Sequence, residues 1–156
     1  YCAAALVQEG LILPPLHVQF VYGIKNALPA LPQLLDFGLA ELKRIAPEAT
    51  WTAAGIGRHQ LEVNRWSLER GGHCRTGLED NIRWDRDHLA KSNAQLVRRV
   101  ADMCAQYDRR PASAGEARQV LSLRNTQSRS PQTGSRPGLS QPPEALHGGP
   151  AGDFWR

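Results

Sequence analysis

Residues 71–81, GGHCRTGLEDN, contain the side chains of this chain that are best suited to chemistry. The run begins like a strand and ends on two adjacent acids, Glu79 and Asp80. Because side chains alternate along a strand, we expect Arg75 and Glu79 on one face and Cys74 and Leu78 on the other, packed under helices. A guanidinium beside two carboxylates can hold a substrate carboxylate, and paired acids can have their pKa values driven apart.

The elements that position this run alternate between strands and helices. Apolar spacing predicts strands near 17–23, 50–56 and 73–79, and helices near 31–46, 60–70, 93–107 and 113–122. Ser113 and Glu116 fit a capping box at the start of the last helix. This alternation predicts a parallel sheet of βαβ units. Three strands by themselves are too few to close a (β/α)₈ barrel, so the spacing alone predicts an α/β fold with an open parallel sheet.

Composition limits the partners that this chain can have. The net charge of +4 is spread along the 156 residues without a basic run, which argues against a nucleic-acid partner. The three cysteines lack CxxC spacing, so neither a disulfide framework nor a thiolate zinc site is indicated. No apolar stretch is long enough to span a membrane. These features together favour a cytoplasmic protein with reduced cysteines.

The end of the chain differs in composition from the rest. Residues 124–156 hold five Pro, five Gly and four Ser, and they show no apolar periodicity. Such a segment cannot bury enough apolar surface to fold, so we predict a disordered tail. The predicted domain organisation is therefore an α/β domain over 1–123 followed by this tail.

Several motifs of the α/β domain resemble the β-keto acid cleavage enzymes, the family of 3-keto-5-aminohexanoate cleavage enzyme. The matching segments occur in the family's order and spacing, and they are 17–23 (HVQFVYG), 54–60 (AGIGRHQ), 71–81 (GGHCRTGLEDN), 92–97 (SNAQLV) and 115–118 (GEAR). The resemblance covers roughly residues 1–123 and implies a partial TIM barrel. This part would be the C-terminal half of the enzyme, with strands six to eight of its (β/α)₈ barrel and their helices.

The resemblance also implies an activity. Members of the family exchange the acyl part of a β-keto acid with acetyl-CoA, giving acetoacetate and a new acyl-CoA, and they use a divalent metal, usually Zn²⁺. They commonly form homotetramers. Two of the metal ligands are a His-x-His pair on an early strand, and no two of this chain's five histidines are spaced in that way. We therefore expect this chain alone to be inactive.

Roles for single residues follow from the same resemblance. Glu79 is the expected metal ligand, Asp80 orients catalytic groups and takes part in proton transfer, and Arg75 binds and polarises the β-keto acid. Arg58 follows the second predicted strand at the same end of the barrel, where it could contact the acyl-CoA or line the site.

Each of these residues could instead have a purely structural role. Glu79 could be a helix cap or an ion-paired carboxylate, Asp80 a solvated loop acid, and Arg75 a structural partner of either acid. Arg58 could simply make loop hydrogen bonds. For the whole chain, the alternatives are a non-catalytic truncated relic and another metal-dependent barrel enzyme, such as an aldolase.

Overall fold

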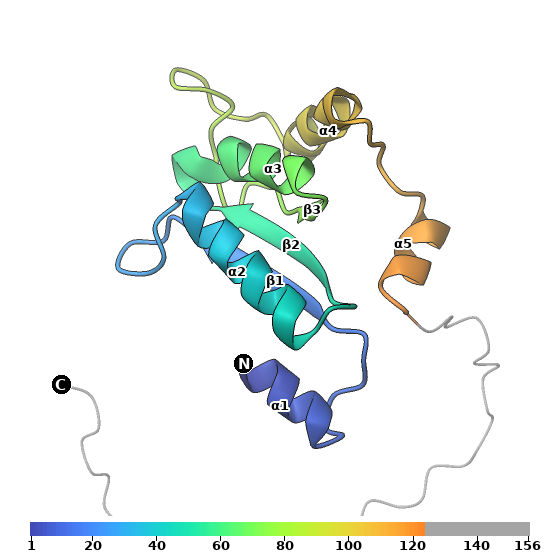
Figure 1. Ribbon diagram of the computed structural model, residues 1–156. Helices are drawn as coiled ribbons and strands as arrows, with labels where there is room; N and C mark the ends of the chain where they lie inside the picture. The colour runs from blue at the N-terminus through green and yellow to red at the C-terminus, as the bar shows by residue number, and fades with distance from the viewer. Residues whose placement is uncertain (124–156) are drawn as a thin grey trace, which may run out of the picture. The chain divides into compact units, whose positions relative to one another are not determined.

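The computed structural model describes residues 1–123, which form an α/β unit of alternating helices and strands (Figure 1). The predicted disordered tail, 124–156, lies outside the described residues. In chain order the elements are α1 (Cys2–Gln8), β1 (His17–Tyr22), α2 (Pro32–Ile45), β2 (Thr50–Gly55), the 3₁₀ turn η1 (Gly57–His59), α3 (Gln60–Glu69), β3 (His73–Cys74), α4 (Asn93–Met103), the 3₁₀ turn η2 (Cys104–Tyr107) and α5 (Ala114–Val120).

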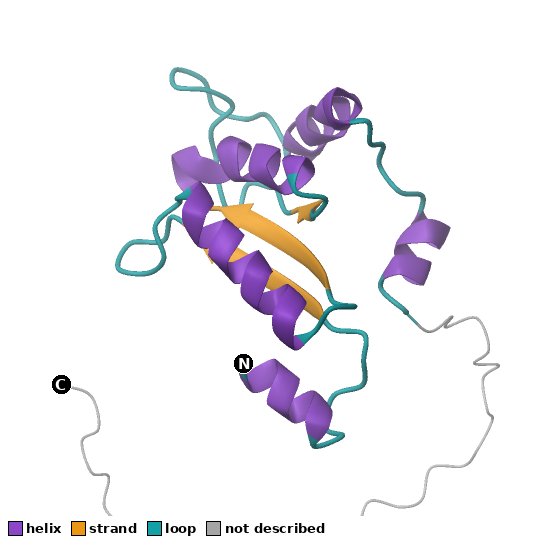
Figure 2. Ribbon diagram, in the orientation of Figure 1, coloured by secondary structure: helices purple, strands orange, loops and turns teal. Residues whose placement is uncertain are grey.

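The strands form one parallel sheet in the order β1-β2-β3, with α2 and α3 as the connections between neighbouring strands (Figure 2). His17 of β1 pairs with Thr50, and Thr52 of β2 pairs with His73. The prediction of three sequential parallel strands is confirmed. Within residues 1–123 the sheet has these three strands, and the closed barrel that the family resemblance implies is not seen in this part of the chain.

The third strand is much shorter than predicted. It pairs only at His73 and Cys74, and one further ladder bond runs from the Arg75 N–H to the Ala53 oxygen (3.1 Å). The chain then turns at Gly77, whose φ of 158° is readily adopted by glycine. The Gly77 oxygen accepts from the backbone N–H groups of Asp80 and Asn81, so residues 77–81 form a turn. Alternation therefore does not set the directions of the side chains after Cys74.

The main hydrophobic core lies between one face of the sheet and the helices α2 and α3. Its buried members are Tyr22, Leu35, Ala53, Val63 and Trp66. The opposite face of β1 carries His17 and Gln19, which are exposed. The sheet thus has an apolar face covered by helices and a polar face, as strand alternation requires.

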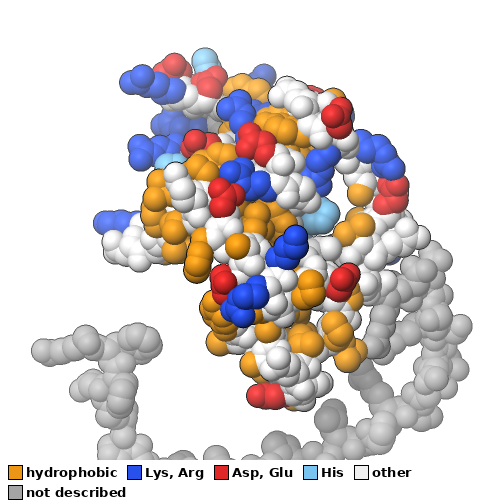
Figure 3. All heavy atoms as spheres, in the orientation of Figure 1, with side chains coloured by type: hydrophobic (Ala, Val, Ile, Leu, Met, Phe, Trp, Pro, Cys, Tyr) orange, Lys and Arg blue, Asp and Glu red, His pale blue; other side chains and the backbone are white. Residues whose placement is uncertain are grey.

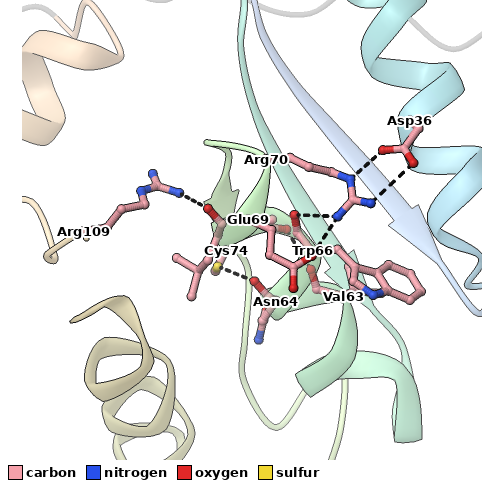
Figure 4. A network of polar contacts seen from close by, with 10 residues as sticks. Asp36, Val63, Asn64, Trp66, Glu69, Arg70, Cys74 and Arg109 are labelled. Atoms are coloured by element: carbon pink, nitrogen blue, oxygen red, sulfur yellow. Dashed lines mark hydrogen bonds and ion pairs between the residues drawn. The ribbon is translucent and has the colours of Figure 1, made fainter. Parts of the chain in front are cut away.

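Polar contacts join α3 to its neighbours (Figure 4). Arg70, at the end of α3, donates through Nε to Asp36 of α2 at 2.5 Å. On the β3 side, the Cys74 thiol donates to the backbone oxygen of Asn64 at 3.4 Å. Arg109 donates through Nη1 to the backbone oxygen of Gly72, just before β3, at 2.6 Å. Cys74 also packs beside a second apolar cluster of Leu68, Met103 and Cys104, so its predicted position under helices is confirmed.

Side-chain caps fix the starts of the last two helices. The Ser92 hydroxyl accepts from the Gln95 N–H at the start of α4. Ser113 and Glu116 form the predicted capping box of α5 in both directions. The helix predicted over 93–107 ends earlier as an α-helix, at Met103, and continues as η2. Among residues 1–123 no helix is both long and apolar enough to cross a membrane.

Gly55 offers a test of how tightly β2 and α3 approach each other. A Cβ atom there would overlap the backbone oxygen of His59, and backbone cannot rotate away as a side chain can. Gly55→Ala should therefore destabilise the chain by about 2 kcal/mol, as overpacking does. Gly115→Ala is the matched control, because its Cβ meets nothing closer than 4.0 Å and alanine favours the helix. Urea unfolding measures both, and equal stability of the two variants would contradict the described packing.

Candidate active site

The carboxyl ends of β2 and β3 are tied together by two hydrogen bonds. The Gly57 N–H donates to the Asp80 backbone oxygen at 2.7 Å, and the Gln60 amide donates through Nε2 to the Gly77 oxygen at 2.9 Å. Gln60 is buried, so this second bond is shielded from water. The turn after β3 is therefore held against the first turn of α3, at the end of the strands where barrel enzymes place their chemistry.

Arg75 lies at the centre of this region and engages both acids. Its Nε donates to Asp80 Oδ2 at 2.8 Å, and its Nη2 donates to Asp80 Oδ1 at 2.7 Å, a bidentate pair. Nη2 also donates to Glu79 Oε1 at 2.8 Å. These bonds, that to Asp80 first, raise the pKa of Arg75. Within the described residues Nη1 of Arg75 makes no hydrogen bond, so two of its N–H donors remain available.

The two acids differ sharply in exposure. The Asp80 side chain is 4% exposed, whereas the Glu79 side chain is 83% exposed. Asp80 has both oxygens occupied by Arg75, whereas among residues 1–123 only Oε1 of Glu79 has a hydrogen-bond partner. Asp80 is thus a buried anchor for the guanidinium, and Glu79 presents a carboxylate to its surroundings.

The surface beside these acids is hollowed. An open depression of about 460 Å³ is lined by the residues that follow β2 and β3, Ile56, Gly57, Arg58 and the segment 78–83. Leu78 lines this depression together with Glu79, so the expectation that alternation separates the two onto opposite faces does not hold here. The reason is the turn at Gly77, which replaces the strand on which the parity argument depended.

Arg58 and two further polar residues of the matching motifs take different places. Arg58 donates through Nε to His59 Nε2 at 3.3 Å and lines the depression. The Asn81 side chain donates through Nδ2 to the Arg83 backbone oxygen and accepts the Arg83 N–H on Oδ1. These two bonds shape the loop that follows. His73 lies at the start of β3, before the acids, with its ring 6.0 Å from that of His17.

A divalent metal does not fit this part of the chain by itself. Among residues 1–123 no three His, Cys, Asp or Glu side chains gather as a metal site requires. Glu79 is exposed, and its Oε2 has no partner in the described part of the chain, so its chemistry suits one ligand of such a site. A catalytic zinc needs about three protein ligands, so the others would have to come from outside the described residues.

Sequence reasoning missed two contributors to this region. Asn93, the first residue of α4, accepts the Leu78 N–H on Oδ1 at 2.7 Å and steadies the acidic turn. Trp84 supports Arg99, whose guanidinium carbon lies 3.4 Å from the centre of the indole ring. The signal for Asn93 was its place at a helix start, which indicates capping and does not reveal a partner on another loop.

A parallel α/β sheet with an arginine and two acids at its carboxyl edge defines the class as an α/β protein with an enzyme-like site. Within that class, the chain belongs to the β-keto acid cleavage enzyme family, whose sequence pattern matches residues 1–123.

Three relatives illustrate the similarity. The chain is 56% identical over 121 residues to the 3-oxoadipate:acetyl-CoA acetyltransferase of Cupriavidus necator, covering 78% of this chain and 43% of the relative. It is 40% identical over 118 residues to the 3-keto-5-aminohexanoate cleavage enzyme of Fusobacterium nucleatum, covering 75% of this chain and 41% of that relative. It is 31% identical over 129 residues to the 3,5-dioxohexanoate:acetyl-CoA acetone transferase of Paraburkholderia graminis, covering 80% and 40%. The chain spans about two fifths of the length of these relatives.

The unequal burial of the two acids predicts unequal effects on stability. Arg75→Ala leaves the buried Asp80 carboxylate without its counterion, which should cost about 2 kcal/mol of unfolding free energy. Glu79→Ala removes an exposed pair and should change stability by less than about 0.5 kcal/mol. Urea unfolding at neutral pH distinguishes them, and a larger loss for Glu79→Ala would contradict the described site.

His73 predicts a pH dependence of stability. Burial, then the neighbouring charges of His17 and Arg109, lower its pKa from 6.5. His73 therefore binds a proton less readily in the folded chain than in the unfolded chain. The contribution of neutral His73 to the free energy of unfolding is complete above about pH 6.5, and it is lost as the pH falls below that value. His73→Gln should make the free energy of unfolding depend less on pH between about pH 7 and 5. An unchanged slope in the variant would show that His73 does not control this dependence.

Proposed function

We propose that residues 1–123 form part of a β-keto acid cleavage enzyme, which exchanges the acyl part of a β-keto acid with acetyl-CoA to give acetoacetate and a new acyl-CoA. Family membership and the names of the relatives, two of which are acetyl-CoA transferases, support this reaction. The remaining part of the site would come from polypeptide outside the described residues, folded with this part into a complete barrel.

The main observation behind the proposal is the pattern of hydrogen bonds made by the Arg75 guanidinium. The acids fix its Nε and Nη2, and no residue within 1–123 binds its Nη1 at the strand ends. A guanidinium anchored on one side presents its remaining donors in a fixed direction, which suits recognition of a planar carboxylate. In our proposal Nη1 of Arg75 holds the carboxylate or keto oxygen of the β-keto acid. The similarity to the Cupriavidus necator relative favours 3-oxoadipate or a related dicarboxylic substrate.

The two acids then have separate roles. Glu79 would provide one ligand of a divalent metal, Zn²⁺ or another, because its Oε2 is free and its side chain is exposed. The metal would supply Lewis-acid chemistry, with its other ligands contributed from outside the described residues. Asp80 would orient Arg75, and it could accept a proton only if Arg75 released one of its two oxygens.

The test combines this chain with the missing part of the site. The chain would be co-expressed with the segment of the Cupriavidus necator relative that it does not match, and the purified pair assayed for zinc and thioester exchange. We expect metal binding and turnover by the pair, and neither by the 156-residue chain alone. Glu79→Gln should lose metal, because a neutral amide is a poor ligand. Arg75→Ala should keep metal and raise the KM for the keto acid by about tenfold to a hundredfold.

The control is Glu69→Gln, which makes the same change at an exposed position at the end of α3, where it contacts Arg70. It should retain both metal and turnover. Full metal content and full rate in Glu79→Gln would contradict the role proposed for Glu79. A soluble pair that never turns over a β-keto acid would favour the alternative of a non-catalytic relic.

A further inference from the structure

A second hollow, of about 550 Å³, lies next to the candidate active site, and its walls are strongly basic. Four arginines line it, namely Arg58, Arg83, Arg86 and Arg99. They come from η1, from the loop between β3 and α4, and from α4, so the fold brings them together from separate segments. In Figure 3, Lys and Arg side chains gather at the upper left of the molecule, over the loop that Figure 1 draws in yellow-green before α4.

Ion pairs among the described residues do not neutralise these arginines. Within residues 1–123 none of the four takes part in an ion pair, whereas Arg44, Arg70, Arg75 and Arg110 all do. The acid that lines the hollow, Asp85, attracts the charge of Arg99, but its hydrogen bonds are made within its own loop. Its Oδ1 accepts from the backbone N–H groups of Asp87 and His88, and its carboxylate also contacts the His88 ring at 2.9 Å. Unpaired guanidinium groups around one hollow create a positive potential that favours a polyanion.

One of the four arginines is fixed in place. Arg99 stacks on the Trp84 ring at 3.4 Å and donates through Nη2 to the Trp84 backbone oxygen. Burial lowers the pKa of Arg99, the nearby carboxylate of Asp85 partly opposes this effect, and the charge of Arg65 adds to it. A bound anion would relieve the cost of holding this charge next to other cations. The hollow therefore combines a pre-positioned guanidinium with others that are exposed on the loop.

The basic hollow continues into the depression beside Glu79. Arg58, Asn81 and Arg83 line both of them, so one extended ligand could occupy the two together. Acetyl-CoA has the required form, since its thioester lies at one end and its diphosphate and 3′-phosphate at the other.

We propose that the basic hollow binds the 3′-phosphoadenosine diphosphate end of acetyl-CoA, an assignment that rests on the proposed function for its choice of ligand. Arg83, Arg86 and Arg99 would contact the phosphates, and Arg58 would lie between the phosphates and the reacting end. The guanidinium group is well suited to this task, because its planar set of donors matches phosphate oxygens.

Direct binding tests this proposal without requiring turnover. Isothermal titration calorimetry of the 156-residue chain would compare CoA, dephospho-CoA and pantetheine. We expect CoA to bind most tightly, dephospho-CoA about tenfold more weakly, and pantetheine not measurably. The double variant Arg83→Ala/Arg86→Ala should weaken CoA binding by about a hundredfold and reduce its dependence on salt. Arg118→Ala is the control, because Arg118 lies on α5, does not line the basic hollow, and hydrogen-bonds the backbone of its own helix.

The outcomes separate this inference from the proposed function. Failure of the chain to bind CoA, equal binding of pantetheine, or unchanged binding by the double variant would overturn the assignment. Tighter binding of inorganic triphosphate than of CoA would also overturn it, since the site would then be a general polyanion site. If CoA binds as expected but the reconstituted pair turns over no β-keto acid, the proposed reaction fails and the nucleotide site stands.

Discussion

The bidentate ion pair between Arg75 and Asp80 is the interaction on which the candidate site depends. Asp80 is buried by the turn that follows β3, and its backbone oxygen receives the N–H of Gly57 from the loop after β2. One residue therefore joins two strand ends through its backbone and fixes a guanidinium through its side chain. A buried carboxylate is stable only with such a counterion, so the turn and the position of Arg75 depend on each other.

This arrangement leaves reactive groups pointing outward. Glu79 retains a free oxygen, Arg75 retains a free Nη1, and both lie beside a depression that continues into the arginine-lined hollow. None of these groups completes a site within the described residues. The proposed keto-acid contact, metal ligand and nucleotide contacts all lie on one continuous stretch of surface, which fits the role of one part of a larger enzyme.

Local rules allowed much of the fold to be predicted from the sequence. Helical spacing and caps located α2, α3 and α5, and the Ser113–Glu116 capping box formed as expected. The same rules failed after Cys74, because extended residues with a glycine can continue a strand or leave it. The basic hollow could not be predicted, since arginines scattered from 58 to 99 resemble ordinary solvated charges. Their convergence depends on how the loop before α4 folds, which hydrogen bonds of Asp85 and Asn81 determine.

A double-mutant cycle on Arg75 and Asp80 tests the central claim most directly. The free energy of unfolding in urea would be measured for the wild-type chain, Arg75→Gln, Asp80→Asn and the double variant. A buried, bidentate pair predicts a coupling energy of about 2 kcal/mol, because each single change strands the partner charge and the double change does not. A coupling energy below about 0.5 kcal/mol, the value typical of an exposed pair, would show that this ion pair does not organise the site.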